Sequence, residues 1–314
     1  MIGYPPQWRA FCALDQDSLC LGYQVTYPMK IDLPVTEQKT NDTLQFTYDS
    51  QKRRSPALEE FWDIIHYRDL VFQLVRRDIV ARYKRSLLGI AWTMLQPLGM
   101  MLVLTLVFSQ LFSQIDGYAA YVLGGLMPWI FFSQTTSAAI QQSVWGGALT
   151  RRIYVPYTAF PAASIGTGLV NFVLSLIPLI AMTLIVGRPI RLSILFLPFP
   201  ILLLSAFALG VGLLLSGVAV RFPDIAEMYQ IILQAWMYLT PIMYPSDILP
   251  EAIRKYLLVL NPMYYLILLF RVPIYDGVLP SPALILISTV IAVVTLVAGW
   301  IYFSHQSDKF AYFS

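Results

Sequence analysis

The hydrophobic positions of this chain form long runs without formal charge, and these runs predict membrane-spanning helices. Residues 86–115, 117–150, 153–187, 192–220 and 277–307 contain no Asp, Glu, Lys or Arg. A helix needs about 20 predominantly apolar residues to cross the hydrocarbon core of a bilayer, and each run is longer than that. Inside lipid every backbone N–H and C=O group needs an internal partner, so such runs are expected to be helical.

The positions of these runs predict six spans and a hairpin. The spans are expected at about 87–112, 118–146, 160–186, 193–219, 227–245 and 281–303. Between the last two, residues 245–276 hold two shorter apolar pieces broken by Pro250, by Asn261-Pro262 and by Pro273. Neither piece is long enough to span, so they predict a re-entrant helical hairpin before the last span. The predicted fold class is an all-α integral membrane protein, with residues 86–314 as its six-span transmembrane domain.

The part before the first span has a different pattern. It holds 12 of the 21 Lys and Arg residues and 11 of the 18 Asp and Glu residues. Residues 1–57 are polar and predict an appendage of unknown role. Residues 58–85 predict an amphipathic interface helix, because Ile65, Phe72 and Val75 fall on one face and Gln73 and Arg76 on another. An ordinary surface helix packed on the appendage is the alternative.

Basic residues near the span ends predict the orientation of the chain. A cluster precedes the first span, and placing it inside gives nine basic residues inside and five outside. Both termini are then cytoplasmic, and so is the appendage. The inner set is Arg76, Arg77, Arg82, Lys84, Arg85, Arg151, Arg152, Arg221 and Lys309, and the outer set is Arg188, Arg191, Arg254, Lys255 and Arg271.

Composition and motifs argue against an enzyme. The chain is 57% hydrophobic and 12% charged, and its net charge of +3 is too small to indicate nucleic acid binding. No phosphate loop of the form GxxxxGK[ST] is present, and the two histidines and two cysteines show no metal-ligand spacing. We therefore expect no catalytic residue and no metal or cofactor site. Leu215-Ser216-Gly217 is faintly similar to an ATPase signature, but small residues within an uncharged span are better explained by close helix packing.

Three segments resemble one family of membrane proteins. They are similar to type-2 ABC exporter permeases, and most similar to the branch that exports O-antigen, capsular polysaccharide and teichoic acid. The resemblance covers about residues 60–314. The segments are Arg77-Asp78-Ile79 with Arg82-Tyr83-Lys84-Arg85-Ser86-Leu87-Leu88-Gly89-Ile90-Ala91-Trp92 and Gln96-Pro97-Leu98; Gly125-Leu126-Met127-Pro128-Trp129 with Phe131-Phe132; and Leu260-Asn261-Pro262-Met263 with Arg271.

The resemblance implies a transporter subunit without its own ATP-binding motifs. By the same resemblance, two copies are expected to form the pore in the plasma (inner) membrane, and two separate ATPase subunits, which bind ATP and Mg, are expected to dock from the cytoplasm. For the basic connector residues, simple anchoring by positive charge on the cytoplasmic side is the alternative to a role in coupling to the ATPases. The residues expected to couple to the ATPases are Arg151, Arg152, Ile153, Tyr154, Val155, Pro156, Arg221, Phe222, Pro223 and Asp224.

The resemblance implies that the cargo is a lipid-linked polysaccharide. Aromatic side chains can stack on the C–H faces of sugar rings, although an interfacial aromatic belt explains single residues as well. The basic cluster before the first span is expected to contact head groups, either of the substrate or of anionic lipids. A permease for a drug or small lipid is the alternative, and a membrane-embedded glycan transferase is a weaker one. The expected path residues are Trp92, Phe108, Tyr121, Trp129, Phe132, Trp145, Tyr238 and Tyr244, and the head-group residues are Arg76, Arg77, Arg82, Lys84 and Arg85.

Overall fold

The computed structural model describes residues 60, 62, 64–84, 88–89, 91–145, 156–187 and 191–310, without the side chains of 145, 252–253 and 307–310. Contacts divide the chain into two units, Met1–Arg53 and Arg54–Ser314, and every described residue belongs to the second. The predicted appendage therefore lies outside the described residues. All regular elements in the described part are helices.

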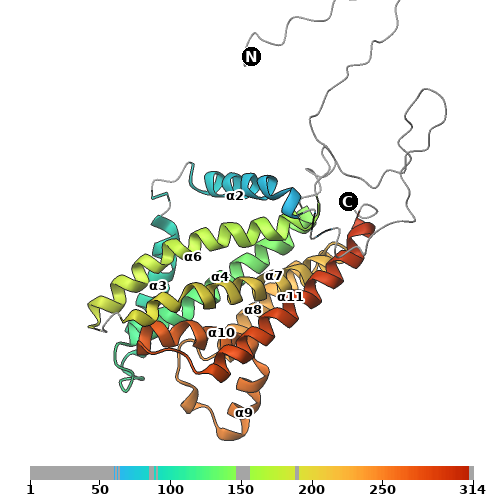
Figure 1. Ribbon diagram of the computed structural model, residues 1–314. Coiled ribbons are helices and arrows are strands. Elements are labelled where there is room, and N and C mark those ends of the chain that lie inside the picture. The colour runs from blue at the N-terminus through green and yellow to red at the C-terminus, as the bar shows by residue number, and fades with distance from the viewer. Residues whose placement is uncertain are drawn as a thin grey trace, which may run out of the picture. The chain divides into compact units, whose positions relative to one another are not determined.

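The helices follow one another along the chain with short connections (Figure 1). Two 3-10 turns, η3 and η4, and a π-type turn, η5, interrupt the series. The elements are α2 (Arg68–Tyr83), α3 (Ala91–Phe108), α4 (Tyr118–Trp145), α6 (Ala159–Ile185), η3 (Leu192–Phe196), α7 (Pro198–Ala219), α8 (Ile225–Leu239), η4 (Ser246–Ile248), α9 (Glu251–Leu260), α10 (Pro262–Arg271), η5 (Val272–Asp276) and α11 (Pro282–Phe310).

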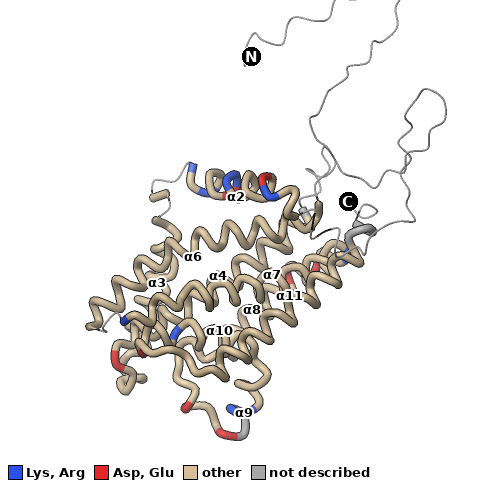
Figure 2. The backbone as a smooth tube through the Cα atoms, viewed as in Figure 1, with Lys and Arg blue, Asp and Glu red and all other residues tan. Residues whose placement is uncertain are grey.

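The structure confirms an all-helical membrane fold, whereas the number of spans stays a prediction. Among the described residues, four helices are long and apolar enough to cross a membrane: Ala91–Phe108, Ala159–Ile185, Leu192–Ala219 and Pro282–Gln306. The number becomes five if the bent pair Arg254–Leu260 and Pro262–Asp276 counts as one span. Charged residues lie on α2 and toward the helix ends, while the long helices are uncharged along most of their length (Figure 2).

Two predicted spans, α4 and α8, do not meet this criterion, and each has a physical reason. The second half of α4 is rich in uncharged polar residues such as Gln134, Ser137, Gln141 and Gln142. A search for charge-free runs does not register these side chains. The helix α8 has only 15 residues, which is about 22 Å at 1.5 Å per residue.

The helix α4 forms the centre of the unit. It packs against α3, α6, α7, α8 and α10, and residues 122–129 are all buried. Aromatic rings from α4, α7 and α8 meet here. The ring centroid of Phe132 lies 5.3 Å from that of Phe207 and 5.4 Å from that of Trp236. The first half of α4 is thus covered by other helices, whereas Gln134 and Gln141 of its polar second half are exposed.

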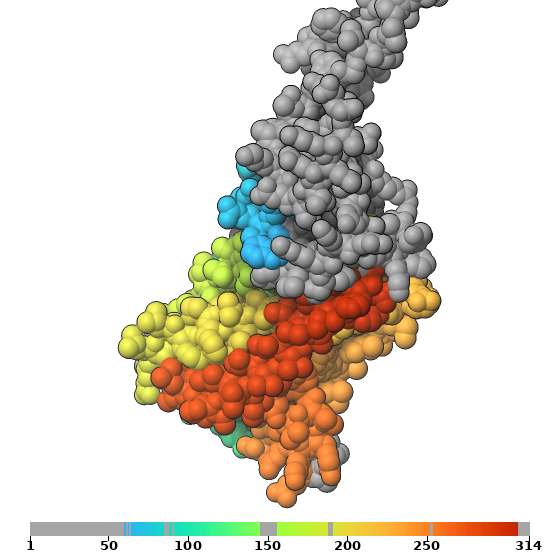
Figure 3. Space-filling view, turned by 45° about the vertical axis from the view of Figure 1, so that its right-hand side comes forward, coloured from blue at the N-terminus to red at the C-terminus, as the bar shows by residue number. Residues whose placement is uncertain are grey.

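Close backbone contact joins α7 to α11. A Cβ atom at Gly299 would overlap the carbonyl group of Gly210, so these two glycines let the backbones touch. Further along, a Cβ at Gly217 would lie 3.1 Å from the Tyr302 ring. The small residues at 215–217 thus serve helix packing, as the sequence indicated. On the outside of this pair, α11 forms a continuous band across one face (red in Figure 3).

The helix α2 runs beside the first half of α6. Leu74 is buried against Phe160 and Ala163, and the Tyr83 hydroxyl donates to Asn171 Oδ1 at 3.1 Å. Nine residues separate the two points on α2 and about as many on α6, so both helices advance roughly 14 Å in the same direction. Phe72, which the helical pattern placed on the apolar face, is 70% exposed, and Leu74 occupies the buried position instead.

The segment between α8 and α11 contains two short helices, α9 and α10, with a bend of 83° between them at Asn261. The Asn261 side chain accepts from the Met263 amide and so caps α10. It also accepts from Trp236 Nε1 at 2.9 Å and donates to Thr240 Oγ1 at 2.9 Å. One amide therefore ties α10 to the end of α8. The two helices form where the sequence placed two apolar pieces.

Candidate functional site

The first predicted coupling segment lies largely outside the described residues. Only Pro156 is described, and it is buried where the chain enters α6. Residues Arg151, Arg152, Ile153, Tyr154 and Val155 are not. The second segment is a turn between α7 and α8 in which Arg221, Phe222, Pro223 and Asp224 are all exposed. The Arg221 guanidinium lies 5.4 Å from the centre of the Phe222 ring, so the turn presents a cation beside an aromatic surface.

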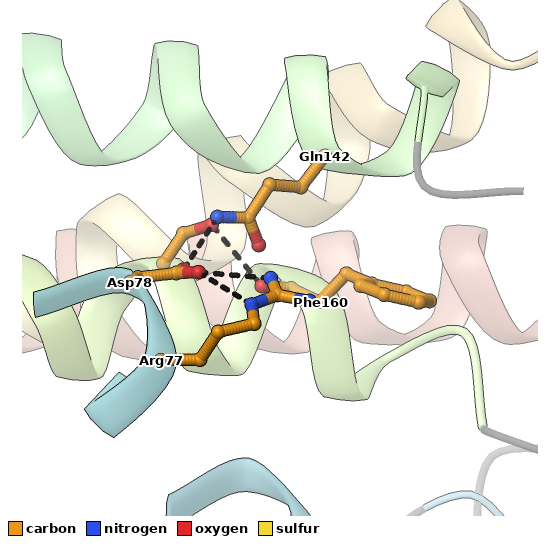
Figure 4. A network of polar contacts seen from close by, with 5 residues as sticks. Arg77, Asp78, Gln142 and Phe160 are labelled. Carbon is orange, nitrogen blue, oxygen red and sulfur yellow. Dashed lines mark hydrogen bonds and ion pairs between the residues drawn. The ribbon is translucent and has the colours of Figure 1, made fainter. Parts of the chain in front are cut away.

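The predicted head-group residues lie on α2 and just after it. Arg76, Arg77, Arg82 and Lys84 are exposed, and Arg85 is outside the described residues. Arg77 donates through Nη2 to Asp78 Oδ1 at 2.8 Å. The other oxygen of Asp78 accepts from Gln142 Nε2 of α4 at 2.9 Å, so Asp78 lies between the two side chains (Figure 4). This network fixes the rotation of α2 and keeps its arginines directed outward.

The predicted path aromatics separate into several groups. Trp129 and Phe132 are 4% and 0% exposed and pack in the core beside Trp236. Trp92 is 56% exposed at the start of α3. Phe108 stacks on Phe112 at 6.1 Å, and the Trp145 side chain is outside the described set.

A tyrosine group lies near the end of α8. The Tyr121 hydroxyl donates to the Tyr244 carbonyl at 3.3 Å, and the Tyr244 hydroxyl donates to the Tyr238 carbonyl at 2.8 Å. Tyr238 itself is 60% exposed. Within a single chain the aromatics thus form separate patches rather than one continuous track.

A stripe of uncharged polar side chains crosses α3, α4 and α8, and sequence reasoning missed it. Gln134 Nε2 donates to Gln96 Oε1 at 3.1 Å, and Gln230 Nε2 donates to Ser137 Oγ at 2.8 Å. All three glutamines are exposed, and so are Gln141 and Gln234. Helical spacing could have predicted this stripe, because residues 134, 137 and 141 share one helix face, and so do residues 230 and 234. We name these residues the polar stripe: Gln96, Gln134, Ser137, Gln141, Gln230 and Gln234.

A cavity of about 190 Å³ lies where α2, α3, α4 and α6 meet. Its walls include Trp92 and Gln96 from α3, Gln134 from α4 and Asn171 from α6, with Arg82 at the α2 side. Each of the three amides comes from a different helix. The Tyr83–Asn171 and Gln96–Gln134 hydrogen bonds use one end of each amide. The cavity lies beside the first two turns of α3, next to the basic end of α2.

Arg271, which the charge count assigned to the outer side, is buried in the core and only 6% exposed. Its guanidinium lies 3.9 Å from the centre of the Tyr121 ring, and Nη2 donates to the Ile242 carbonyl at 3.0 Å. Gly124 and Gly125 make room for it, because a Cβ at Gly125 would overlap Nη2. Arg271 therefore joins the end of α10 to α4 and to the turn after α8.

Apolar helices of spanning length and a bent helix pair define the class: a multi-pass membrane protein, with a row of exposed polar side chains on α3, α4 and α8. Residues 69–275 match the ABC-2 type transporter family. Because that match covers more than half of the chain, the protein belongs to this family and is a transporter component. The resemblance drawn from the three sequence segments is confirmed.

Relatives of known description agree with the family assignment. The chain is 30% identical over 251 residues to the O-antigen export system permease protein RfbA of Myxococcus xanthus, covering 79% of this chain and 96% of the relative. It is 25% identical over 214 residues to a protein of the same description from Klebsiella pneumoniae, covering 67% and 82% of the two chains. It is also 24% identical over 231 residues to the polysialic acid transport protein KpsM of Escherichia coli, covering 72% and 89%.

Proposed function

We propose that this chain is the permease subunit of an ATP-driven exporter that moves a lipid-linked polysaccharide outward across the plasma (inner) membrane. The observation that carries the proposal is the match to an O-antigen export permease over 96% of that relative's length. The match to the polysialic acid transport protein also supports the proposal, because that relative is named for the transport of another polysaccharide. O-antigen-like polymers, capsular polysaccharide and teichoic acid share the chemistry of a long glycan on a lipid anchor, and this is the cargo class we propose.

The proposed topology has six crossings, by α3, α4, α6, α7, α8 and α11. The helix α4 is 28 residues long, about 42 Å, and in this proposal a second copy of the chain covers the exposed polar side chains of its second half. The helix α8 is short, and the buried turn after it, in which Pro241, Ile242 and Met243 contact the core, completes its crossing. The pair α9–α10 re-enters from the outer side. An even number of crossings keeps both termini on the cytoplasmic side, together with the basic residues of α2.

The polar stripe supports a translocation path between two copies of the chain. Gln96, Gln134 and Gln230 are exposed in one copy, and uncharged amides facing lipid are unfavourable because hydrocarbon offers them no hydrogen-bond partner. A second copy placed opposite encloses both stripes and forms a passage lined by hydroxyls and amides. Such groups exchange hydrogen bonds with sugar hydroxyls without fixing one sugar sequence. Exposed Trp92 and Tyr238, with half-buried Tyr121 and Tyr244, supply sugar-stacking faces along it.

The energy source in this proposal is a pair of ATPase subunits that bind ATP and Mg. Residues 151–156 and the exposed turn of Arg221, Phe222, Pro223 and Asp224 are the proposed docking elements. The turn joins α7 to α8 directly, so a force on it reaches the polar stripe through Gln230 and Gln234. The helix α2 is proposed to lie at the cytoplasmic membrane surface, where Arg76, Arg82 and Lys84 meet anionic head groups.

Deleting the gene and locating the polymer tests this function. We expect surface polysaccharide to disappear and lipid-linked polymer to accumulate inside, with both effects reversed by the intact chain. Normal surface polysaccharide without internal accumulation would overturn the proposal, and loss of resistance to a drug instead would indicate a small-molecule permease.

Alanine substitutions test the proposed docking of the ATPase. Alanine at Arg151, Ile153 and Tyr154 should abolish stimulation of the ATPase, whereas alanine at Arg254 and Lys255 on α9 should leave it unchanged.

A further inference from the structure

The cavity between α2, α3, α4 and α6 has the chemistry of a sugar-binding site. Three amide side chains, Gln96, Gln134 and Asn171, converge on it from three helices. Polar side chains within spanning helices are costly in lipid and mark ligand pathways when they face a cavity. Each amide uses either its oxygen or its nitrogen in a hydrogen bond between helices. Helix packing therefore does not account for the other polar atom of each side chain.

The unused halves of these amides form a mixed set of donors and acceptors. Gln134 Nε2 and Gln96 Oε1 bond each other, and Asn171 Oδ1 accepts from Tyr83. Among the described residues, Gln96 Nε2 and Asn171 Nδ2 remain as donors without a partner, and Gln134 Oε1 remains as an acceptor. Sugar hydroxyls both donate and accept, and therefore satisfy such a set.

An aromatic wall and a cation complete the cavity. Trp92 lines it with 56% of its surface exposed, and the indole face can stack on the C–H face of a sugar ring. Arg82 lies at the α2 side and forms no ion pair among the described residues. A guanidinium binds phosphate through two parallel hydrogen bonds. The cavity has a volume of about 190 Å³, which suits a single sugar unit better than a polymer segment.

We propose that each chain binds, in this cavity, the sugar–phosphate unit that joins the glycan to its lipid anchor. The ring stacks on Trp92 with its hydroxyls on Gln96 and Asn171, and Arg82 binds the phosphate. This inference rests on the proposed function and deepens it, because it makes the anchor-proximal sugar the part that the permease recognises. The cavity opens beside the start of α3, which the proposed topology places at the inner head-group level, where a lipid anchor holds that sugar.

Binding to the intact permease–ATPase complex in nanodiscs of phosphatidylethanolamine and phosphatidylglycerol tests the site. The probes are a polyprenyl diphosphate that bears one N-acetylhexosamine and the same diphosphate without sugar. We expect the sugar-bearing probe to bind more tightly. Gln96→Leu and Trp92→Ala should each weaken it about three- to tenfold, the effect of one hydrogen bond or one stacking contact. Both variants should leave the sugarless probe within about twofold, and Arg82→Gln should weaken both probes.

Two controls keep the test specific. Gln110→Leu changes an exposed glutamine beyond the opposite end of α3 and should bind both probes like the wild type. Trp92→Phe keeps a ring and should recover much of the affinity that Trp92→Ala loses. Because Trp92 is largely exposed, neither change opens the core.

Equal affinity of the two probes, absence of binding to the wild type, or cavity variants that behave like Gln110→Leu would overturn the inference. These outcomes leave the proposed function standing if the deletion strain still loses surface polysaccharide. Conversely, normal export in the deletion strain would overturn the proposed function, whatever affinities the two probes show.

Discussion

The guanidinium of Arg271 lies 3.9 Å from the centre of the Tyr121 ring, deep inside the helical unit. The same side chain donates to the Pro241 carbonyl at 3.4 Å and to the Ile242 carbonyl at 3.0 Å. One residue at the end of α10 thus contacts α4 and the turn that follows α8. Because the polar stripe also runs along α4 and α8, this contact joins two of the helices that carry it.

Replacing Arg271 by Lys tests the contact without changing the charge. Lysine is a point charge that cannot stack on Tyr121 and reach two carbonyls together. We expect the free energy of unfolding to fall by about 1–3 kcal/mol, seen as a lower midpoint in thermal unfolding of the detergent-solubilised protein. Arg254→Lys on α9 is the matched control, because this half-exposed arginine only approaches the exposed Asp247 at 3.5 Å. Equal midpoints for the two variants would contradict the role of Arg271.

Replacing Gly299 by Ala tests the close packing of α7 and α11. The new Cβ would overlap the backbone carbonyl of Gly210, and backbone cannot move aside as a flexible side chain can. We expect a loss of about 2 kcal/mol or more, within the range for overpacked sites. Gly99→Ala in α3 is the control, because no atom lies within 4 Å of its Cβ position and alanine favours a helix. If Gly299→Ala were as stable as Gly99→Ala, the close contact between the α7 and α11 backbones would not contribute to stability.

The Asn261 amide makes three hydrogen bonds at the bend between α9 and α10. Asn261→Ala removes a helix cap and two side-chain partners, so we expect it to destabilise the protein by about 2–3 kcal/mol. Trp236→Phe removes the indole donor and part of a ring that packs on Trp129 and Phe132, and should cost about 1–2 kcal/mol. In the double variant the effects should be less than additive, because the two residues share one bond. Strict additivity in thermal unfolding would argue that this bond does not contribute.

The Asp78–Gln142 hydrogen bond holds α2 on the bundle. Asp78→Asn removes the charge that both partners use, and we expect α2 to undock more often, by a factor of about five for a loss of roughly 1 kcal/mol. Trypsin cleavage after Arg76, Arg77 or Arg82 in intact membranes should accelerate by that factor. Asp69→Asn removes the same charge from an exposed position on the same helix. If the two variants are cleaved at the same rate, the network does not anchor α2.

Charge-free runs predicted the positions of the long helices closely. The expected spans 160–186 and 193–219 correspond to Ala159–Ile185 and Leu192–Ala219. Lipid imposes this pattern directly, because a charged side chain facing hydrocarbon is expensive. The two apolar pieces around Asn261-Pro262 likewise became α9 and α10, because proline ends a helix at a predictable point.

Tertiary relationships were beyond the reach of the same reasoning. The burial of Arg271 could not be predicted, because nothing local shows that Gly124 and Gly125 of a distant helix leave space for a guanidinium. Trp129 and Phe132 appeared suitable for a sugar path, but they fill the core beside Trp236. The polar stripe was readable from its helical spacing. Formal charge does not reveal it, because glutamine is polar but carries no charge.

Transport in a reconstituted system tests the central claim most directly. Proteoliposomes that contain this chain and its ATPase, with lipid-linked polysaccharide on the ATPase side, should show the polymer becoming accessible to a glycosidase on the opposite side only when ATP is present. Alanine at Arg151, Ile153 and Tyr154 should abolish that appearance. Polymer that stays on the ATPase side in the presence of ATP, or that crosses equally without it, would contradict the account.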